Sequence, residues 1–114
     1  MKHRMNLRLT PFDMIRSGQK TIELRLYDEK RREIKVGDEI EFDCLDKDAT
    51  PIVVRVMNIY RFDNFDALYA TLPLLKCGYN KNTIVNAAPS DMNQYYSIEE
   101  QEQFGVVGIE IELA

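Results

Sequence analysis

The run of residues 52–60 constrains the fold of this chain more than any other stretch. It is long, nearly all apolar and rich in β-branched side chains, a composition typical of β-strands. The preceding segment 39–44 alternates apolar and polar residues, and only a polar turn separates the two segments. Because that connection is short, we expect the two to pair as an antiparallel hairpin.

Shorter periodic segments surround this hairpin. Further strands are expected over residues 4–10, 21–27 and 106–113. Short helices are expected over residues 11–17, 64–76, 90–96 and 98–102. Pro73 should break the second of these helices, and Ser90 should cap the third. About five strands with short helices between them indicate an α+β fold with a small barrel-like sheet, although periodicity alone does not distinguish a barrel from an open sheet.

Chain length and hydropathy predict a single domain over residues 1–114. No apolar run reaches the roughly 18 residues of a membrane-spanning helix, so no membrane segment is expected. The N-terminus lacks the apolar stretch of a signal peptide, and a cytoplasmic location is therefore expected. The oligomeric state stays open.

Charge is distributed unevenly along the chain. The net charge is −4, yet residues 1–35 carry a balance of +5 and residues 36–114 a balance of −9. This excludes a uniformly basic nucleic-acid binder but leaves room for a local positive surface. Residues 30–32 with Lys35 are the obvious candidates, and the alternative is a solvated loop whose acidic neighbours cancel the field.

Few residues suit metal or nucleophilic chemistry. Cys44 and Cys77 share no paired-cysteine motif, so free thiols are expected. His3 is the only histidine, which argues against a histidine-based zinc site and against Ser-His or Cys-His catalysis. No phosphate-binding or dinucleotide-binding loop is present, so we expect neither a cofactor nor a metal.

The octet of residues 18–25 contains the side chains best suited to bind a ligand. After Gly18 the chain alternates, which predicts a half-buried strand with Glu23 and Arg25 on its polar face. With Lys20 these side chains can hold a planar polar ligand by charge-assisted hydrogen bonds. The alternatives are a solvated face with a weak ion pair, or a buried ion pair that sets the strand register. Strict alternation would place Lys20 on the apolar face, unless a turn releases it.

Gly18, Lys20, Glu23 and Arg25 match the signature Gly-x-Lys-x-x-Glu-x-Arg of the ASCH domain, the activating signal cointegrator homology domain. Segments around the octet also resemble the family in the same order, over roughly residues 5–113. They are residues 7–9, 11–17, 36–42 and 104–111. The resemblance implies a PUA-like fold, which is a compact β-barrel with flanking helices.

The resemblance also implies a binding cleft for RNA, a nucleotide or a modified nucleoside. In related proteins the segment before the last strand lines this cleft. In this chain that segment contains the aromatic pair Tyr95 and Tyr96, which can stack on a base. The candidate ligand-binding residues are Gly18, Lys20, Thr21, Glu23, Arg25, Tyr95, Tyr96 and Ser97.

Two other functions stay open. Small ASCH proteins include an amidohydrolase that acts on N4-acetylcytidine, and its catalytic lysine corresponds to Lys20. Its threonine falls at Glu23 and its glutamate has no counterpart, because no glutamate lies between Glu41 and Glu99. If the chain is an enzyme, Lys20 and Glu23 are the expected catalytic residues. The third hypothesis is a protein-interaction domain that uses the apolar stretch 62–75 as its partner surface.

Overall fold

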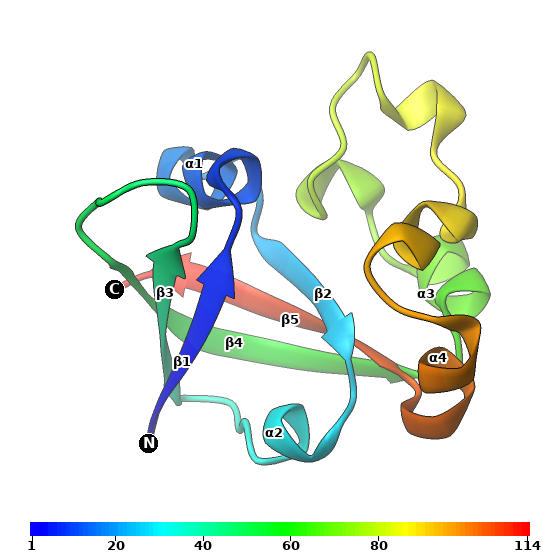
Figure 1. Ribbon diagram of the computed structural model, residues 1–114, viewed down its shortest axis with the longest axis horizontal. Helices are drawn as coiled ribbons and strands as arrows, with labels where there is room; N and C mark the ends of the chain where they lie inside the picture. Colours follow the sequence, from blue (N-terminus) through cyan, green and yellow to red (C-terminus); the bar gives the residue numbers. More distant parts are fainter.

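A single curled sheet organises the molecule. The computed structural model describes all residues 1–114. Its five strands have the spatial order β1-β3-β4-β5-β2 and curl into a half-barrel (Figure 1). The strands are β1 (Lys2–Leu7), β2 (Ile22–Leu26), β3 (Glu39–Cys44), β4 (Ile52–Phe62) and β5 (Val106–Leu113). The predicted α+β architecture with a small barrel-like sheet is confirmed.

Strand pairing explains where the half-barrel stays open. The predicted hairpin is confirmed, because β3 and β4 pair antiparallel. Strand β1 runs parallel to β3, and β2 pairs antiparallel with β5. The two ends of the sheet are therefore β1 and β2. One side chain bridges them, since Arg25 Nη2 donates to the Asn6 carbonyl oxygen at 2.9 Å. We call this gap the seam.

Short helices and 3₁₀ turns connect the strands. They are α1 (Leu9–Ser17), α2 (Glu29–Arg32), α3 (Phe65–Thr71) and α4 (Ile98–Phe104), with 3₁₀ turns η1 (Leu74–Lys76), η2 (Ile84–Asn86) and η3 (Pro89–Gln94). None of these helices has the length and apolar content needed to cross a membrane.

The helix boundaries correct several expectations. Strand β1 ends at Leu7 and α1 begins at Leu9, so Pro11 lies inside the first turn. The expected break at Pro73 is confirmed. In place of the helix expected over residues 90–96, Pro89–Gln94 form the 3₁₀ turn η3. Ser90 does not cap it: the Asp91 carboxylate accepts the Ala88 N–H at 3.2 Å instead. The one-turn helix α2 was not predicted, because its charged residues show no apolar periodicity.

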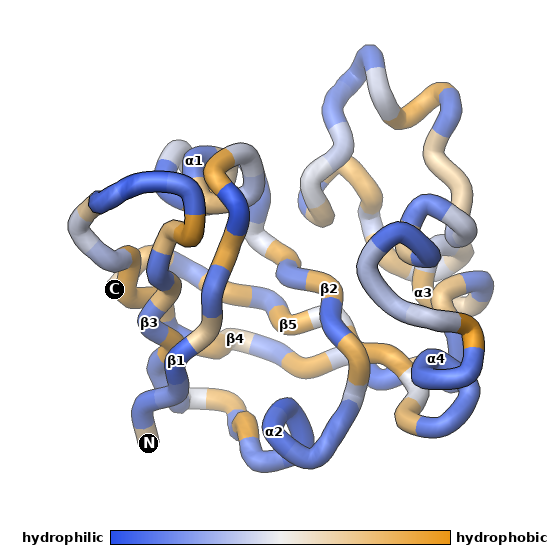
Figure 2. Tube along the Cα trace, in the orientation of Figure 1, coloured by the Kyte–Doolittle hydropathy of each residue, from blue (hydrophilic) through white to orange (hydrophobic).

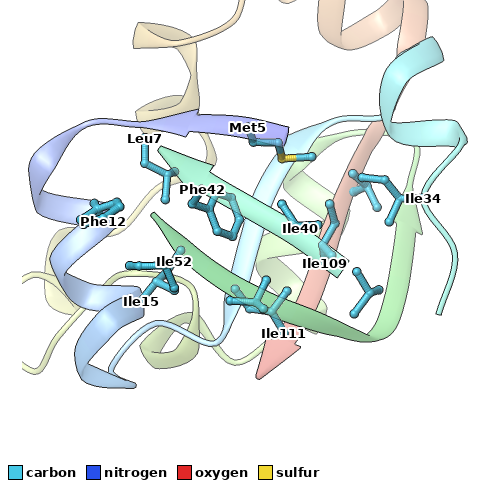
Figure 3. Packing of buried hydrophobic residues seen from close by; sticks show 13 residues of the cluster. Met5, Leu7, Phe12, Ile15, Ile34, Ile40, Phe42, Ile52, Ile109 and Ile111 are labelled. Carbon is cyan, nitrogen blue, oxygen red and sulfur yellow. The ribbon is translucent and has the colours of Figure 1, made fainter. Parts of the chain in front are cut away.

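The concave side of the sheet holds the larger core, which we call the barrel cluster. Its thirteen buried residues converge from α1, from β1, β3, β4 and β5, and from Ile34 in the loop before β3 (Figure 3). Phe42 and Val54 are fully buried. Burying a side chain of this size contributes roughly 1.5–3 kcal/mol. In Figure 2, apolar residues follow β4 and β5, whereas the loop after β3 and helix α2 are hydrophilic.

A second core, the helical cluster, lies between the other face of β2 and the helices. Its nine buried residues include Ile22, Leu24 and Leu26 from β2 and Phe65 and Leu68 from α3. The apolar residues of segment 62–75 thus pack mainly inward, and they offer little partner surface. Leu75 is an exception, because its side chain in η1 is 47% exposed.

Candidate functional site

A tight turn before β2 decides where Lys20 lies. Gly18 ends α1 in the left-handed conformation (φ 84°), which a glycine adopts without steric cost. The Lys20 N–H then donates to the Met14 carbonyl, and β2 begins only at Ile22. Lys20 is therefore outside the alternating strand. Its ammonium group contacts Glu23 Oε1 at 2.7 Å, as a turn rather than strict alternation would allow.

Glu23 lies at the centre of an ion triad with Lys20 and Arg25. Its side chain is only 3% exposed, and its second oxygen accepts from Arg25 Nε at 3.1 Å and Nη2 at 2.9 Å. Burial by itself raises the pKa of Glu23. The charges of Lys20 and Arg25 and their hydrogen bonds outweigh that effect and lower the pKa to about 2. Two cations around one carboxylate leave the triad with a net positive charge.

The triad faces the interior of the half-barrel at the seam. Glu23 lies opposite Ile109 and Arg25 opposite Val107, and directly paired residues share one face of a sheet. Both partners belong to the barrel cluster. Strand β2 is therefore covered on both faces, so the expectations of a half-buried strand and of a solvated ion pair are wrong. The alternative of a buried ion pair is confirmed.

A cavity of about 440 Å³ opens beside the triad. Lys20, Glu23 and Arg25 line it from β2 and the turn before it, and Met14 lines it from α1. The far walls come from α3 and from the segment between η1 and α4. Four tyrosines of these elements line the cavity: Tyr69, Tyr79, Tyr95 and Tyr96. A mixed apolar and polar cavity of this size is within the usual range of small-molecule sites, roughly 300–1,000 Å³.

A chain of hydrogen bonds forms a second polar wall. The hydroxyl groups of Tyr69 and Tyr79 lie 2.7 Å apart, and Tyr79 donates to Asp91 Oδ2 at 2.7 Å. Burial raises the pKa of Tyr79, and its bonds to Tyr69 and Asp91 raise it further, so the phenol keeps its proton. Nearby, burial raises the pKa of Cys77 to about 11. This side chain is therefore a thiol and a weak nucleophile.

The family follows from a direct comparison. A family model of the ASCH domain matches residues 5–114. The chain belongs to the ASCH domain family. Among curated proteins no match was found.

Solved structures resemble this ASCH domain along its whole length. The hypothetical protein PH0355 is 34% identical, with a TM-score of 0.83 and 100% of both chains covered. Protein PF0455 from Pyrococcus furiosus is 32% identical, with a TM-score of 0.75, 99% of this chain covered and 97% of the other. A mutant of the protein ZmASCH from Zymomonas mobilis shares the fold at 12% identity (TM-score 0.68), with 98% of this chain covered and 70% of the other.

The structure brings together five of the eight candidate residues that the sequence suggested. Lys20, Glu23, Arg25, Tyr95 and Tyr96 line one cavity. Gly18, Thr21 and Ser97 do not line it. Gly18 ends α1 and Thr21 donates its N–H to the Lys76 carbonyl. The Ser97 hydroxyl accepts from the Glu100 N–H at 3.1 Å and caps α4, as its capping-box spacing predicts.

Sequence reasoning missed Tyr69, Cys77, Tyr79 and Asp91 as cavity residues. They lie far from the octet in sequence, on α3 and in loops and 3₁₀ turns with no periodic pattern, so no local signal joins them to it. The basic segment 30–32 lies elsewhere. Arg31 pairs with Asp28 at 3.1 Å, and Arg32 donates to the Tyr27 carbonyl at 3.0 Å. No group of three His, Cys, Asp or Glu side chains is placed to hold a metal ion.

Proposed function

We propose that this ASCH domain binds a nucleobase in its cavity, as a nucleoside, as a nucleotide or as an unstacked base of RNA. The binding unit is the single domain of residues 1–114. One observation carries the proposal: the buried carboxylate of Glu23 holds two cationic side chains at the wall of a cavity that is lined by tyrosines.

The triad supports binding of hydrogen-bond acceptors. Both Glu23 oxygens are occupied, whereas Lys20 uses one of its three N–H donors and Arg25 Nη1 has no partner in the protein. Glu23 itself could also accept from a ligand by its residue type, but its side chain is only 3% exposed. Glu23 orients the two cations, and these donate to a carbonyl oxygen, a ring nitrogen or a phosphate oxygen.

The tyrosines support binding of a flat ring. Tyr95 is 64% exposed at the cavity edge, and Tyr96 is stacked on Phe65 with 6.4 Å between the ring centroids. Stacking of a base on such a side chain contributes roughly 1–3 kcal/mol. A net charge of −4 disfavours binding that depends on many phosphate contacts. Recognition of one base suits this chain better than affinity for a long backbone.

The shifted pKa values of Glu23 and Cys77 argue against hydrolysis as the main function. With its pKa near 2, Glu23 is a poor proton acceptor at neutral pH, and the raised pKa of Cys77 keeps that group a thiol. Incubation with N4-acetylcytidine at high protein concentration tests the amidohydrolase hypothesis. Release of cytidine that Lys20→Met abolishes would establish the enzyme.

Calorimetric titration with nucleosides, nucleoside monophosphates and short single-stranded RNAs tests the binding function. We expect wild-type protein to bind, and Tyr95→Ala and Lys20→Met each to weaken binding by about tenfold or more. Lys30→Met is the matched control, because Lys30 is exposed on α2 and does not line the cavity. Equal affinity of Tyr95→Ala, Lys20→Met and Lys30→Met would place the site elsewhere.

A further inference from the structure

The charges that line the cavity do not cancel. The cationic side chains of the lining are Arg8, Lys20 and Arg25, and its carboxylates are those of Glu23 and Asp91. One cation is therefore in excess. An excess charge at a partly enclosed wall is costly, because burial removes the water that would otherwise solvate it.

The excess charge is located at the triad. The Arg8 side chain is 71% exposed and pairs with Asp46 at 3.2 Å, so water and a carboxylate already compensate its charge. Lys20 and Arg25 are only 11% and 15% exposed, and they share the single carboxylate of Glu23. The triad thus carries a net positive charge that is largely removed from water.

The other carboxylates near the triad have partners of their own. Asp28 pairs with Arg31 at 3.1 Å. Asp91 belongs to the hydrogen-bonded wall and accepts from the Tyr79 hydroxyl at 2.7 Å. Neither carboxylate forms an ion pair with a cation of the triad, so an anion from outside the chain is the group that would balance its charge.

Both cations are held in place before a ligand binds. Arg25 donates to Glu23 through Nε and Nη2, and it donates to the Asn6 carbonyl across the seam. The stem of Lys20 lies against Gly78, where a Cβ would be 3.6 Å from Lys20 Cδ. Groups that the protein already fixes lose little conformational freedom on binding, so charge-assisted hydrogen bonds to them contribute more to affinity.

A phosphate group suits this pair of cations better than the edge of a base does. A phosphate monoester carries a charge of about −1.5 to −2 at neutral pH and three strong acceptor oxygens. The edge of a base is neutral, and it would leave the excess charge of the triad uncompensated. The attraction between opposite charges also does not require any single N–H group to point in one particular direction.

We infer that the triad is a phosphate subsite, and that the cavity takes a nucleotide or a phosphate of an RNA strand in preference to a free nucleoside. This inference rests on the proposed function. It also orients the ligand: the phosphate lies at Lys20 and Arg25, and the base lies against the tyrosines of the far walls.

Titration of nucleosides against their monophosphates tests the inference. The probes are the four ribonucleosides and their 5′- and 3′-monophosphates. For the base that binds best, we expect at least one monophosphate to bind about tenfold or more tightly than the nucleoside. A nucleoside that binds as tightly as both of its monophosphates would overturn the inference and leave the proposed function standing. Absence of binding to nucleosides, monophosphates and short RNAs would overturn both.

Dinucleoside monophosphates distinguish the two sources of the phosphate. Their phosphate is a diester that joins two nucleosides, as in an RNA strand. Tighter binding of these probes than of the monophosphates would identify an RNA strand as the source, and weaker binding would identify a terminal phosphate. Either result supports the subsite as long as the phosphorylated probe binds more tightly than the nucleoside.

Lys20→Met locates the phosphate, because it leaves the neutral pair of Glu23 and Arg25 at the wall. The preference for monophosphate over nucleoside should fall by about tenfold or more. Lys20→Arg keeps the charge and should keep the preference. Lys30→Met is the matched control, since Lys30 is exposed on α2 and does not line the cavity.

The preference itself is the readout, and a general loss of affinity does not change it. A folded Lys20→Met protein that keeps the wild-type preference would overturn the phosphate subsite at the triad. If that variant does not fold, the wild-type comparison of nucleosides with their monophosphates decides alone.

Discussion

The barrel cluster and the helical cluster use the same kinds of apolar residue, but they differ in what surrounds them. The residues of the barrel cluster come from four strands, from α1 and from Ile34. Because side chains alternate along each strand, the inward-facing ones form a continuous core. The helical cluster packs β2 against α3 and against irregular segments, and it is flanked by Tyr60, Tyr69 and Tyr96. A cavity remains at this border, and its lining includes Leu7 of the barrel cluster and Leu24 of the helical cluster.

Strand β2 joins the two regions, because each cluster takes one of its faces. Ile22, Leu24 and Leu26 pack into the helical cluster, whereas Glu23 and Arg25 point to the barrel side at the seam. The charged side chains thus occupy the place where the sheet fails to close. We therefore expect stability to reside mainly in the barrel cluster, and the proposed binding site lies at the border between the two.

The largest expected effect is on the barrel cluster. Phe42→Ala removes a fully buried ring and should lower the free energy of unfolding by about 3–5 kcal/mol. Leu75→Ala, at the exposed edge of the helical side, should stay within about 0.5 kcal/mol of wild type. Urea denaturation measures both. Similar losses for the two variants would contradict the assignment of the core.

The next largest effect is the loss of the Glu23 charge in acid. Folding lowers the pKa of Glu23 from 4.5 to about 2, so the carboxylate stabilises the fold fully above pH 4.5 and loses that contribution as the pH falls to 2. The contribution is about 3 kcal/mol. The stability difference between wild type and Glu23→Gln should therefore shrink over this window.

Denaturation curves between pH 7 and pH 2 measure that difference. Asp38, whose hydrogen bond from His3 is the main cause of its lowered pKa, titrates in the same range. It is present in both proteins and cancels in the comparison. A difference that does not change with pH would rule out the charge of Glu23 as the stabilising factor.

A smaller effect is expected where β5 meets the helical cluster. Gly108 leaves room for Leu72, because a Cβ at this position would lie 2.6 Å from Leu72 Cδ1. Gly108→Ala should cost about 1–3 kcal/mol through overpacking. In a Leu72→Ala background the same change should cost much less, and a double-mutant cycle measures the coupling. An equal cost in both backgrounds would show that Leu72 is not the obstacle.

The smallest effect concerns Ser97, which the sequence suggested as a ligand residue. Ser97→Ala should cost about 1 kcal/mol by removing the cap of α4 and should leave nucleoside affinity unchanged. Thermal unfolding and calorimetric titration check the two parts separately. A clear loss of nucleoside affinity in the folded variant would show that Ser97 contributes to ligand binding.

Much of the fold could be predicted because its signals are local. The hairpin of β3 and β4 and the break at Pro73 depend on neighbouring residues, and both are confirmed. The site could be predicted only in part. Lys20, Glu23 and Arg25 lie within one octet, whereas Tyr79 and Asp91 come to the cavity from distant turns. Local patterns carry no information about which distant turns will meet.

The sequence by itself determined that Glu23 and Arg25 share one face of β2 and that Ile22 shares the other with Leu24, since side chains alternate along a strand. Only the tertiary structure decided which face looks into the barrel and that both faces are covered. It also decided, through the turn at Gly18, that Lys20 meets Glu23. The physical reason is that alternation sets relative directions, whereas burial depends on segments packed from elsewhere in the chain.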